Sequence, residues 1–119
     1  MTHYMKLKDK PFELIRDGKK TIELRLYDEK RRMVAVGDEI EFTKMTDETQ
    51  KITIKVVALH IFGSFEELYR SLPLDKCGYD SDNIKTASAS DMNEYYPVEE
   101  QLQYGVVGIE FEKQDRLRH

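Results

Sequence analysis

Three charged side chains that stand close together are the residues of this sequence best suited to chemistry. Lys20, Glu23 and Arg25 all lie within the stretch 18–25. Lysine and arginine donate hydrogen bonds to phosphate or to the edge of a base, whereas a glutamate accepts them from a base amino group or orients a guanidinium. Surface ion pairs have the same composition and contribute little to stability. Whether the three residues form a ligand site therefore depends on how the chain positions them.

A short helix leads into this stretch. Pro11 stands near the start of the segment 11–17 and Gly18 directly follows it, which is the asymmetry typical of a helix. After Gly18 the sequence period changes to two. Ile22, Leu24 and Leu26 alternate with polar or aromatic residues over 20–27, and this pattern predicts a strand with one apolar face.

Glu23 and Arg25 share the other face of that predicted strand. At the rise of a β-strand their Cα atoms lie about 7 Å apart, so the guanidinium can orient the carboxylate or both groups can hold one ligand. Strict alternation would place Lys20 on the opposite face. Because Lys20 directly follows the turn at Gly18, where the phase is unreliable, its side chain could swing to the mouth of the same surface.

The spacing Gly18-x-Lys20-x-x-Glu23-x-Arg25 resembles the signature of the ASCH domain, a branch of the PUA-like superfamily. The segment Val36–Phe42, and Tyr96 followed by the segment Tyr104–Phe111, resemble two further motifs of that family. The resemblance implies a single domain over residues 1–112 with a small barrel fold. It also implies that Lys20, Glu23 and Arg25 line a cleft at the barrel mouth.

The patterns along the rest of the chain agree with a small barrel. Alternating or apolar runs predict strands over 3–7, 39–42, 51–62 and 105–112, with a hairpin turn over 46–50 and both faces of the strand 57–62 buried. A capping box at Ser64 predicts a helix that ends at Pro73, and a second short helix is expected from Ser88 or Ser90 to Tyr96. Residues 28–36 and 73–87 are interpreted as loops and residues 113–119 as a frayed tail. The predicted fold class is α+β, a small mixed PUA-like barrel of about five to six strands with short flanking helices.

Composition limits the classes of function. The chain has 119 residues, 39% hydrophobic and 35% charged, with a net charge of −4 and a single cysteine, Cys77. These values predict one cytoplasmic domain without a membrane span, a disulfide or a multi-cysteine zinc site. Charge is uneven, with +3 between Arg16 and Arg32 and −7 over the rest. A locally basic region could receive a phosphate or a single nucleotide, although a solvated charged loop explains it equally well.

Other residue types add little to the predicted site. Tyr79 and Tyr96 could offer stacking faces to unpaired bases, and core or rim packing is the favoured interpretation for Tyr96. His3, His60 and His119 do not cluster, and Asp75, Asp80 and Asp82 lack the spacing of a calcium loop. We therefore expect no metal and no cofactor.

Two functions are open at this point. In a binding module, Lys20 and Arg25 would contact phosphate or a base edge, Glu23 would accept from a base amino group, and the loop 73–87 would act as a lid. ASCH domains are generally proposed to bind RNA, so the expected partner is RNA or a modified nucleoside or nucleotide. The oligomeric state is left open.

The alternative is an enzyme. The chain is similar to a bacterial ASCH branch that deacetylates N4-acetylcytidine with a Lys, a Thr and a Glu, in which the lysine corresponds to Lys20. Glu23 stands where that branch has its threonine, and Thr21 lies at a different depth on the same strand face. Lys20 could still act as a base, with Glu23 activating a water, and a metal-independent ribonuclease is a further possibility. We favour binding because the nucleophile is missing.

Overall fold

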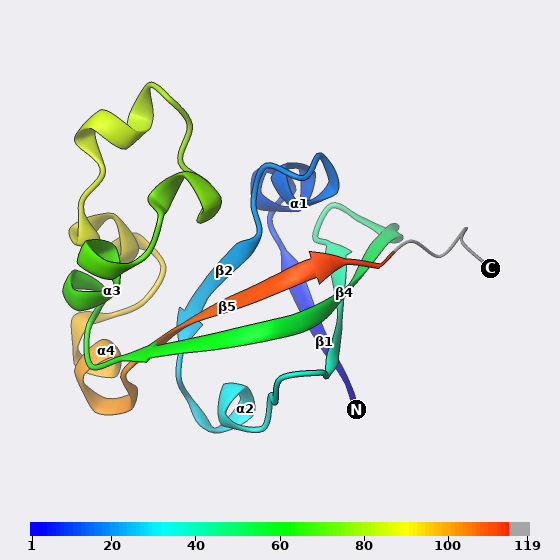
Figure 1. The fold of residues 1–119 in the computed structure, drawn as a ribbon, viewed down its shortest axis with the longest axis horizontal. Helices are drawn as coiled ribbons and strands as arrows, with labels where there is room; N and C mark the ends of the chain where they lie inside the picture. Colours follow the sequence, from blue (N-terminus) through cyan, green and yellow to red (C-terminus); the bar gives the residue numbers. More distant parts are fainter. Residues whose placement is uncertain (115–119) are drawn as a thin grey trace.

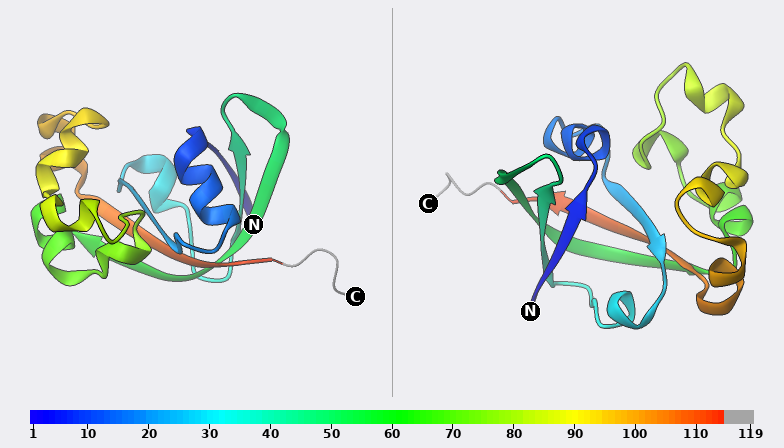
Figure 2. Two further views of the ribbon diagram at one scale, coloured as in Figure 1. Left: turned by 90° about the horizontal axis from the view of Figure 1, so that it is seen from above. Right: turned by 180° about the vertical axis from the view of Figure 1, so that it is seen from behind.

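A single mixed sheet of five strands organises residues 1–114, the part of the chain that the computed structural model describes. The strand order is β1-β3-β4-β5-β2, and only the pair β1 and β3 is parallel. Figures 1 and 2 show the sheet curled into a half-barrel, with β1 and β2 as its free edges. The predicted α+β class is confirmed, and the predicted small mixed barrel of about five strands is present as a half-barrel. The strands are β1 (Thr2–Leu7), β2 (Ile22–Leu26), β3 (Glu39–Lys44), β4 (Asp47–Phe62) and β5 (Val106–Lys113).

Besides a short helix between β2 and β3 that is described below, helices connect the strands at two places. The helix α1 (Asp9–Arg16) follows β1, whereas α3 (Phe65–Ser71) and α4 (Val98–Tyr104) lie at the far end of β4 and β5 (Figure 1). Between α3 and α4 the chain forms the 3₁₀ helices η1 (Leu74–Lys76), η2 (Asn83–Thr86) and η3 (Ala89–Glu94). We call residues 74–96 the upper segment. In Figures 1 and 2 it stands beside β2, separated along the sheet from the hairpin of β3 and β4.

The helix before the charged stretch forms as predicted, starting two residues earlier than expected. It buries Phe12 and Ile15 against the concave side of the sheet, and Gly18 ends it with a φ of 78°. A positive φ is adopted by glycine at little energetic cost, which explains why the chain turns there. Ser64 also caps α3 as predicted, accepting a hydrogen bond from the Glu67 amide at 3.3 Å.

The two faces of β2 belong to different parts of the core. Ile22, Leu24 and Leu26 pack with residues of α3 and with Met92. Glu23 and Arg25 pair across the ladder with Ile109 and Val107 of β5, which belong to the cluster inside the half-barrel. Residues directly opposite in an antiparallel ladder share a face. Glu23 and Arg25 therefore point into the concave side.

Several sequence-based expectations need correction. The hairpin turn is only Met45 and Thr46, so β4 begins at Asp47 rather than in the fifties. Val57 and Ile61 are 39% and 50% exposed, so the far half of β4 is not buried on both faces. A register shift between Val56 and Ala58 breaks the alternation there.

Three segments hold more structure than expected. The presumed loop 28–36 contains a short helix, α2 (Glu29–Arg32), and α4 was not foreseen. The loop 73–87 contains two 3₁₀ helices, and the helix expected before Tyr96 is the 3₁₀ helix η3. Lys113 belongs to β5 and not to the tail predicted over 113–119, and residues 115–119 lie outside the described residues. Within residues 1–114, no helix is long and apolar enough to cross a membrane.

Candidate functional site

Lys20, Glu23 and Arg25 form one buried ion cluster. Lys20 Nζ lies 2.8 Å from Glu23 Oε1, and Arg25 Nε donates to Glu23 Oε2 at 2.8 Å. The side chains of Lys20, Glu23 and Arg25 are only 10%, 7% and 14% exposed. Breaking a buried pair costs far more than breaking a surface pair, because the remaining charge is left without compensation. These contacts differ from ordinary surface ion pairs in that respect.

Lys20 reaches the cluster because the turn after α1 departs from strand geometry. The amides of Lys19 and Lys20 both donate to the Leu14 carbonyl oxygen, at 2.9 and 3.1 Å, and β2 begins only at Ile22. Alternation therefore does not apply at position 20. Gly78, with a φ of 114°, lies against the other side of the lysine, where an added Cβ would stand 3.5 Å from Lys20 Cδ.

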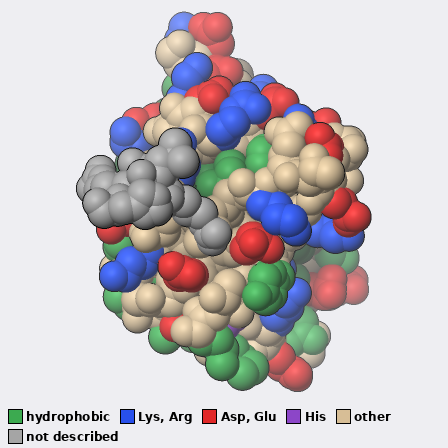
Figure 3. All heavy atoms as spheres, turned by 90° about the vertical axis from the view of Figure 1, so that its right-hand side faces the viewer, with side chains coloured by type: hydrophobic (Ala, Val, Ile, Leu, Met, Phe, Trp, Pro, Cys, Tyr) green, Lys and Arg blue, Asp and Glu red, His purple; other side chains and the backbone are tan. Residues whose placement is uncertain are grey.

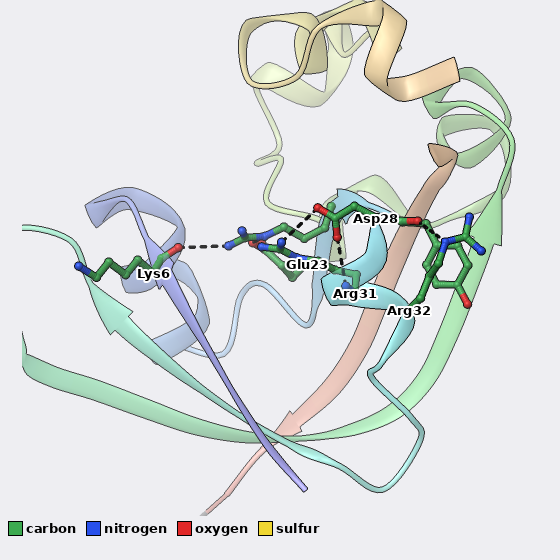
Figure 4. Close-up of polar contacts among 7 residues, drawn as sticks. Lys6, Glu23, Asp28, Arg31 and Arg32 are labelled. Atoms are coloured by element: carbon green, nitrogen blue, oxygen red, sulfur yellow. Dashed lines mark hydrogen bonds and ion pairs between the residues drawn. The ribbon is translucent and has the colours of Figure 1, made fainter. Parts of the chain in front are cut away.

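Arg25 also joins the two free edges of the sheet. Its Nη2 donates to the Lys6 carbonyl oxygen at 3.1 Å, which ties β2 to β1 although the two strands do not pair (Figure 4). An edge strand presents unpaired backbone groups. The guanidinium satisfies one of them and holds Glu23 with its other side.

The cluster keeps Glu23 ionised. Burial would raise the pKa of this carboxyl, but the charges of Lys20 and Arg25 and their hydrogen bonds outweigh burial and lower the pKa to about 2. Burial likewise acts against the charge of Arg25, and the Glu23 carboxylate more than restores it, so the pKa of Arg25 is raised. The cluster holds two cations and one anion, so it places a net positive charge on the concave side of the sheet.

The five residues proposed from the sequence all line one cavity of about 570 Å³, which we call the tyrosine pocket. One wall comes from β1 and α1 and includes Leu7, Pro11 and Leu14. The opposite wall comes from the upper segment and includes Tyr79 and Tyr96. The ion cluster lies in β2 and the turn before it, between elements that the sequence places far apart.

The two tyrosines have different surroundings. Tyr96 stacks on Phe65 with ring centroids 6.1 Å apart, so its expected packing role is confirmed, and it also lines the pocket. Tyr79 donates from its hydroxyl to Asp91 Oδ2 at 2.8 Å and lies 2.7 Å from the Tyr69 hydroxyl. Burial and these two partners raise the pKa of Tyr79, which keeps its phenol protonated.

Sequence reasoning missed several residues of the pocket, among them Asn83, Asp91, Glu94 and Tyr95. A partial signal existed for Asp91, because Ser88 and Asp91 have capping-box spacing and form that box in the structure. Its bond to Tyr79 could not be foreseen. Cys77 also lines the pocket, and burial raises the pKa of its thiol to about 12, so it is protonated and unreactive.

Other candidate residues lie away from this pocket. Thr21 is not among the residues that line it. His3 Nε2 lies 2.8 Å from Asp38 Oδ2, and His60 Nε2 lies 2.8 Å from Glu110 Oε1, so each is held by a carboxylate. His119 is outside the described residues. Within residues 1–114, no group of three or more His, Cys, Asp or Glu side chains is arranged to hold a metal ion.

Comparison with known families decides where the chain belongs. The model of the ASCH domain family matches residues 5–115. The chain belongs to the ASCH domain family. The match spans all three motifs that carried the resemblance, around Gly18, Gly37 and Gly105.

Solved structures similar to this ASCH domain share its fold. A crystal structure of the hypothetical protein PH0355 is 35% identical, covers 96% of this chain and 100% of its own, and has a TM-score of 0.79. A solution structure of protein PF0455 from Pyrococcus furiosus is also 35% identical, covers 97% and 99%, and has a TM-score of 0.74. The crystal structure of ASCH from Zymomonas mobilis is 17% identical, covers 93% and 66%, and shows the same fold with a TM-score of 0.61. No curated protein matched the chain.

Proposed function

We propose that this ASCH domain binds the base of an RNA or of a nucleotide in the tyrosine pocket. One observation carries the proposal: a buried cluster of Lys20, Glu23 and Arg25 lies in the wall of a cavity that also has aromatic walls. Buried charges are costly, and a charged group in a cavity whose pKa is shifted by burial and by specific charge partners, as that of Glu23 is, is a candidate for a functional site. A cavity of about 570 Å³ also falls within the range of pockets that hold small ligands.

The cluster has hydrogen-bonding capacity left for a ligand. Each Glu23 oxygen accepts one charged hydrogen bond and has a second lone pair available. Lys20 and Arg25 likewise have N–H groups beyond those that contact Glu23 and the Lys6 carbonyl. A heterocycle with an amino group beside an acceptor could therefore donate to Glu23 and accept from one of the cations, as base edges do.

The tyrosines supply the apolar part of the interaction. Tyr79, Tyr95 and Tyr96 line the same pocket, and aromatic side chains stack on bases of any sequence. The bond from Tyr79 to Asp91 holds one ring in place before a ligand arrives. A fixed ring loses little conformational entropy on binding, which favours affinity.

Deacylation of N4-acetylcytidine has less support. The pKa of Glu23 is about 2, so this carboxylate is a weak base at neutral pH. Thr21 does not line the pocket and the Cys77 thiol stays protonated, so neither of these two described residues supplies a nucleophile beside Lys20. Ribonuclease chemistry also has less support. A histidine could transfer protons in such a reaction, but neither His3 nor His60 lines the pocket.

An NMR titration of the isotope-labelled protein with the common ribonucleosides and with N4-acetylcytidine tests the proposal. Nucleosides lack phosphate, so they probe the pocket alone. Shifts should appear at Glu23, Tyr79 and Tyr96, and Lys20→Met should weaken binding by about tenfold to a hundredfold, since a hydrogen bond to a charged group is worth roughly 1.5–3 kcal/mol. The matched control is Lys19→Met, which removes an exposed neighbouring lysine that does not line the pocket.

Equal binding by both lysine variants, or no binding by the unmodified protein, would refute the proposal. Chromatography of N4-acetylcytidine after incubation with the protein supplies the second readout. We expect the nucleoside to be recovered intact. Conversion to cytidine that is lost in Lys20→Met would replace the binding function with an amidohydrolase.

A further inference from the structure

A second hollow lies on the side of Arg25 that faces away from the tyrosine pocket. Its volume is about 590 Å³, and its cations come from four separate elements: Lys6 on β1, Arg25 on β2, Lys30 and Arg31 on α2, and Lys51 on β4. Among residues 1–114, two carboxylates, Glu41 and Glu48, face it. We call this space the basic hollow. It is locally positive in a chain whose net charge is −4.

Arg25 and Lys6 line both the tyrosine pocket and the basic hollow. The hydrogen bond from Arg25 to the Lys6 carbonyl oxygen therefore forms part of the partition between them. A ligand that occupies both spaces must cross this partition. It therefore needs one chemical group in the tyrosine pocket, another in the basic hollow and a linker between them. A nucleotide unit has this form, because a flat base and a charged phosphate are joined through a sugar.

The three lysines of the basic hollow, Lys6, Lys30 and Lys51, are free to exchange partners. Lys30 is exposed and has no ion-pair partner within residues 1–114. Lys6 lies 2.9 Å from Glu48 and Lys51 lies 3.7 Å from Glu41, but in the first pair both side chains are more than 60% exposed, and Lys51 is 49% exposed. Such pairs contribute little, so a phosphate could replace a carboxylate as partner at small cost.

Arg31 is incompletely satisfied. Its Nη1 lies 3.3 Å from Asp28 Oδ2, and its Nε is buried without a hydrogen-bond partner among the described residues (Figure 4). A buried donor without an acceptor is unfavourable. An anion that accepts a hydrogen bond from this guanidinium would therefore be bound favourably.

On the face shown in Figure 3, basic and acidic side chains are interspersed. A duplex laid across such a surface would meet carboxylates as well as cations, and its bases would be unable to enter a pocket. A single strand avoids both problems.

We propose that the basic hollow binds the backbone phosphate next to the base held in the tyrosine pocket, so that the ligand is a single-stranded RNA that crosses the sheet edge at Arg25. This inference rests on the proposed function and adds the polymeric nature of the ligand. Phosphate contacts position a strand without reading its sequence. The tyrosine pocket would select the base, and the basic hollow would set the direction of the strand.

Fluorescence anisotropy with a short single-stranded oligoribonucleotide tests this, with the nucleoside titration run beside it. The variant is Lys30→Gln with Lys51→Gln, and the control is Lys55→Gln with Lys85→Gln, which removes two cations that line neither cavity. The first variant should weaken RNA binding by about tenfold or more and reduce the slope of log K against log salt by roughly 1.4, about 0.7 per lost phosphate contact. Nucleoside binding should not change, and the control should stay within about twofold of the unmodified protein.

Each other outcome is decisive. Equal loss in the variant and the control shows general attraction and overturns the inference. RNA binding that survives in the variant while the nucleoside still binds overturns the inference and leaves the proposed function intact. Failure of the unmodified protein to bind nucleosides refutes the proposed function itself. Polyglutamate that binds the unmodified protein as tightly as the RNA would assign the hollow to an acidic peptide instead.

Discussion

The two charged regions that Arg25 separates differ in how much water has been removed from them. Lys20 and Glu23 are about 10% and 7% exposed, whereas Lys6 and Glu48 on the other side are 62% and 66% exposed. The two ion pairs have nearly equal lengths, 2.8 and 2.9 Å. Contact distance alone therefore says little about what an ion pair contributes. Desolvation makes the buried cluster rigid and costly to disturb, while the exposed pairs remain exchangeable.

The largest difference should appear when one carboxylate is neutralised in each region. Glu23→Gln leaves Lys20 and Arg25 buried with no counter-charge, and we expect it to lower the free energy of unfolding by about 3–5 kcal/mol. Urea unfolding followed by circular dichroism measures the change, since a shift in midpoint at constant slope reports stability.

Glu48→Gln is the matched control for that measurement. It removes the same charge from an exposed pair, and we expect the urea midpoint to stay close to that of the unmodified protein, because water screens the pair. Similar midpoint shifts for the two variants would show that the cluster is not desolvated in solution as it is in the structure.

The stability that the buried cluster contributes should also depend on pH. Glu23 has a pKa of about 2 in the folded protein against an ordinary value of 4.5, so its stabilisation is present above about pH 4.5 and is lost as the pH falls through about 2. At about 1.4 kcal/mol per pKa unit, the loss is on the order of 3 kcal/mol. Urea midpoints from pH 2 to pH 6 for the unmodified protein and for Glu23→Gln measure it, because other carboxylates cancel in the difference. A difference that does not change with pH would contradict the assignment.

A smaller effect than that of Glu23→Gln is expected at Tyr79, in the wall that the upper segment contributes to the tyrosine pocket. Tyr79→Phe removes the hydroxyl that bonds to Asp91 and Tyr69, and we expect a loss of about 1 kcal/mol. Tyr95→Phe is the control, because Tyr95 lines the same pocket and is 53% exposed. Thermal unfolding of both variants should show a lower midpoint for the first alone. Equal midpoints would mean that the ring of Tyr79 is not held in solution.

Local patterns in the sequence determined the elements around the site. Pro11 and Gly18 predicted α1, which begins two residues before Pro11 and ends before Gly18, and the two-residue period placed Glu23 and Arg25 on one face of β2. These predictions succeeded because each depends on neighbours within a few residues, where steric rules are strong. The family motifs added the barrel, since the resemblance covers nearly the whole chain.

Long-range contacts decided what the charged stretch became. The Lys6 carbonyl oxygen that meets Arg25 lies 19 residues away, and Tyr79 and Tyr96 reach the same cavity from beyond β4. Lys20 turned toward Glu23 because the backbone after α1 does not have strand geometry. The amides of Lys19 and Lys20 donate to the Leu14 carbonyl oxygen instead of to a neighbouring strand. No local pattern records such contacts. Sequence alone supplied the charges and their shared strand face, and tertiary packing decided which of them lost their water and which stayed in solvent, because burial depends on segments that meet only in the folded chain.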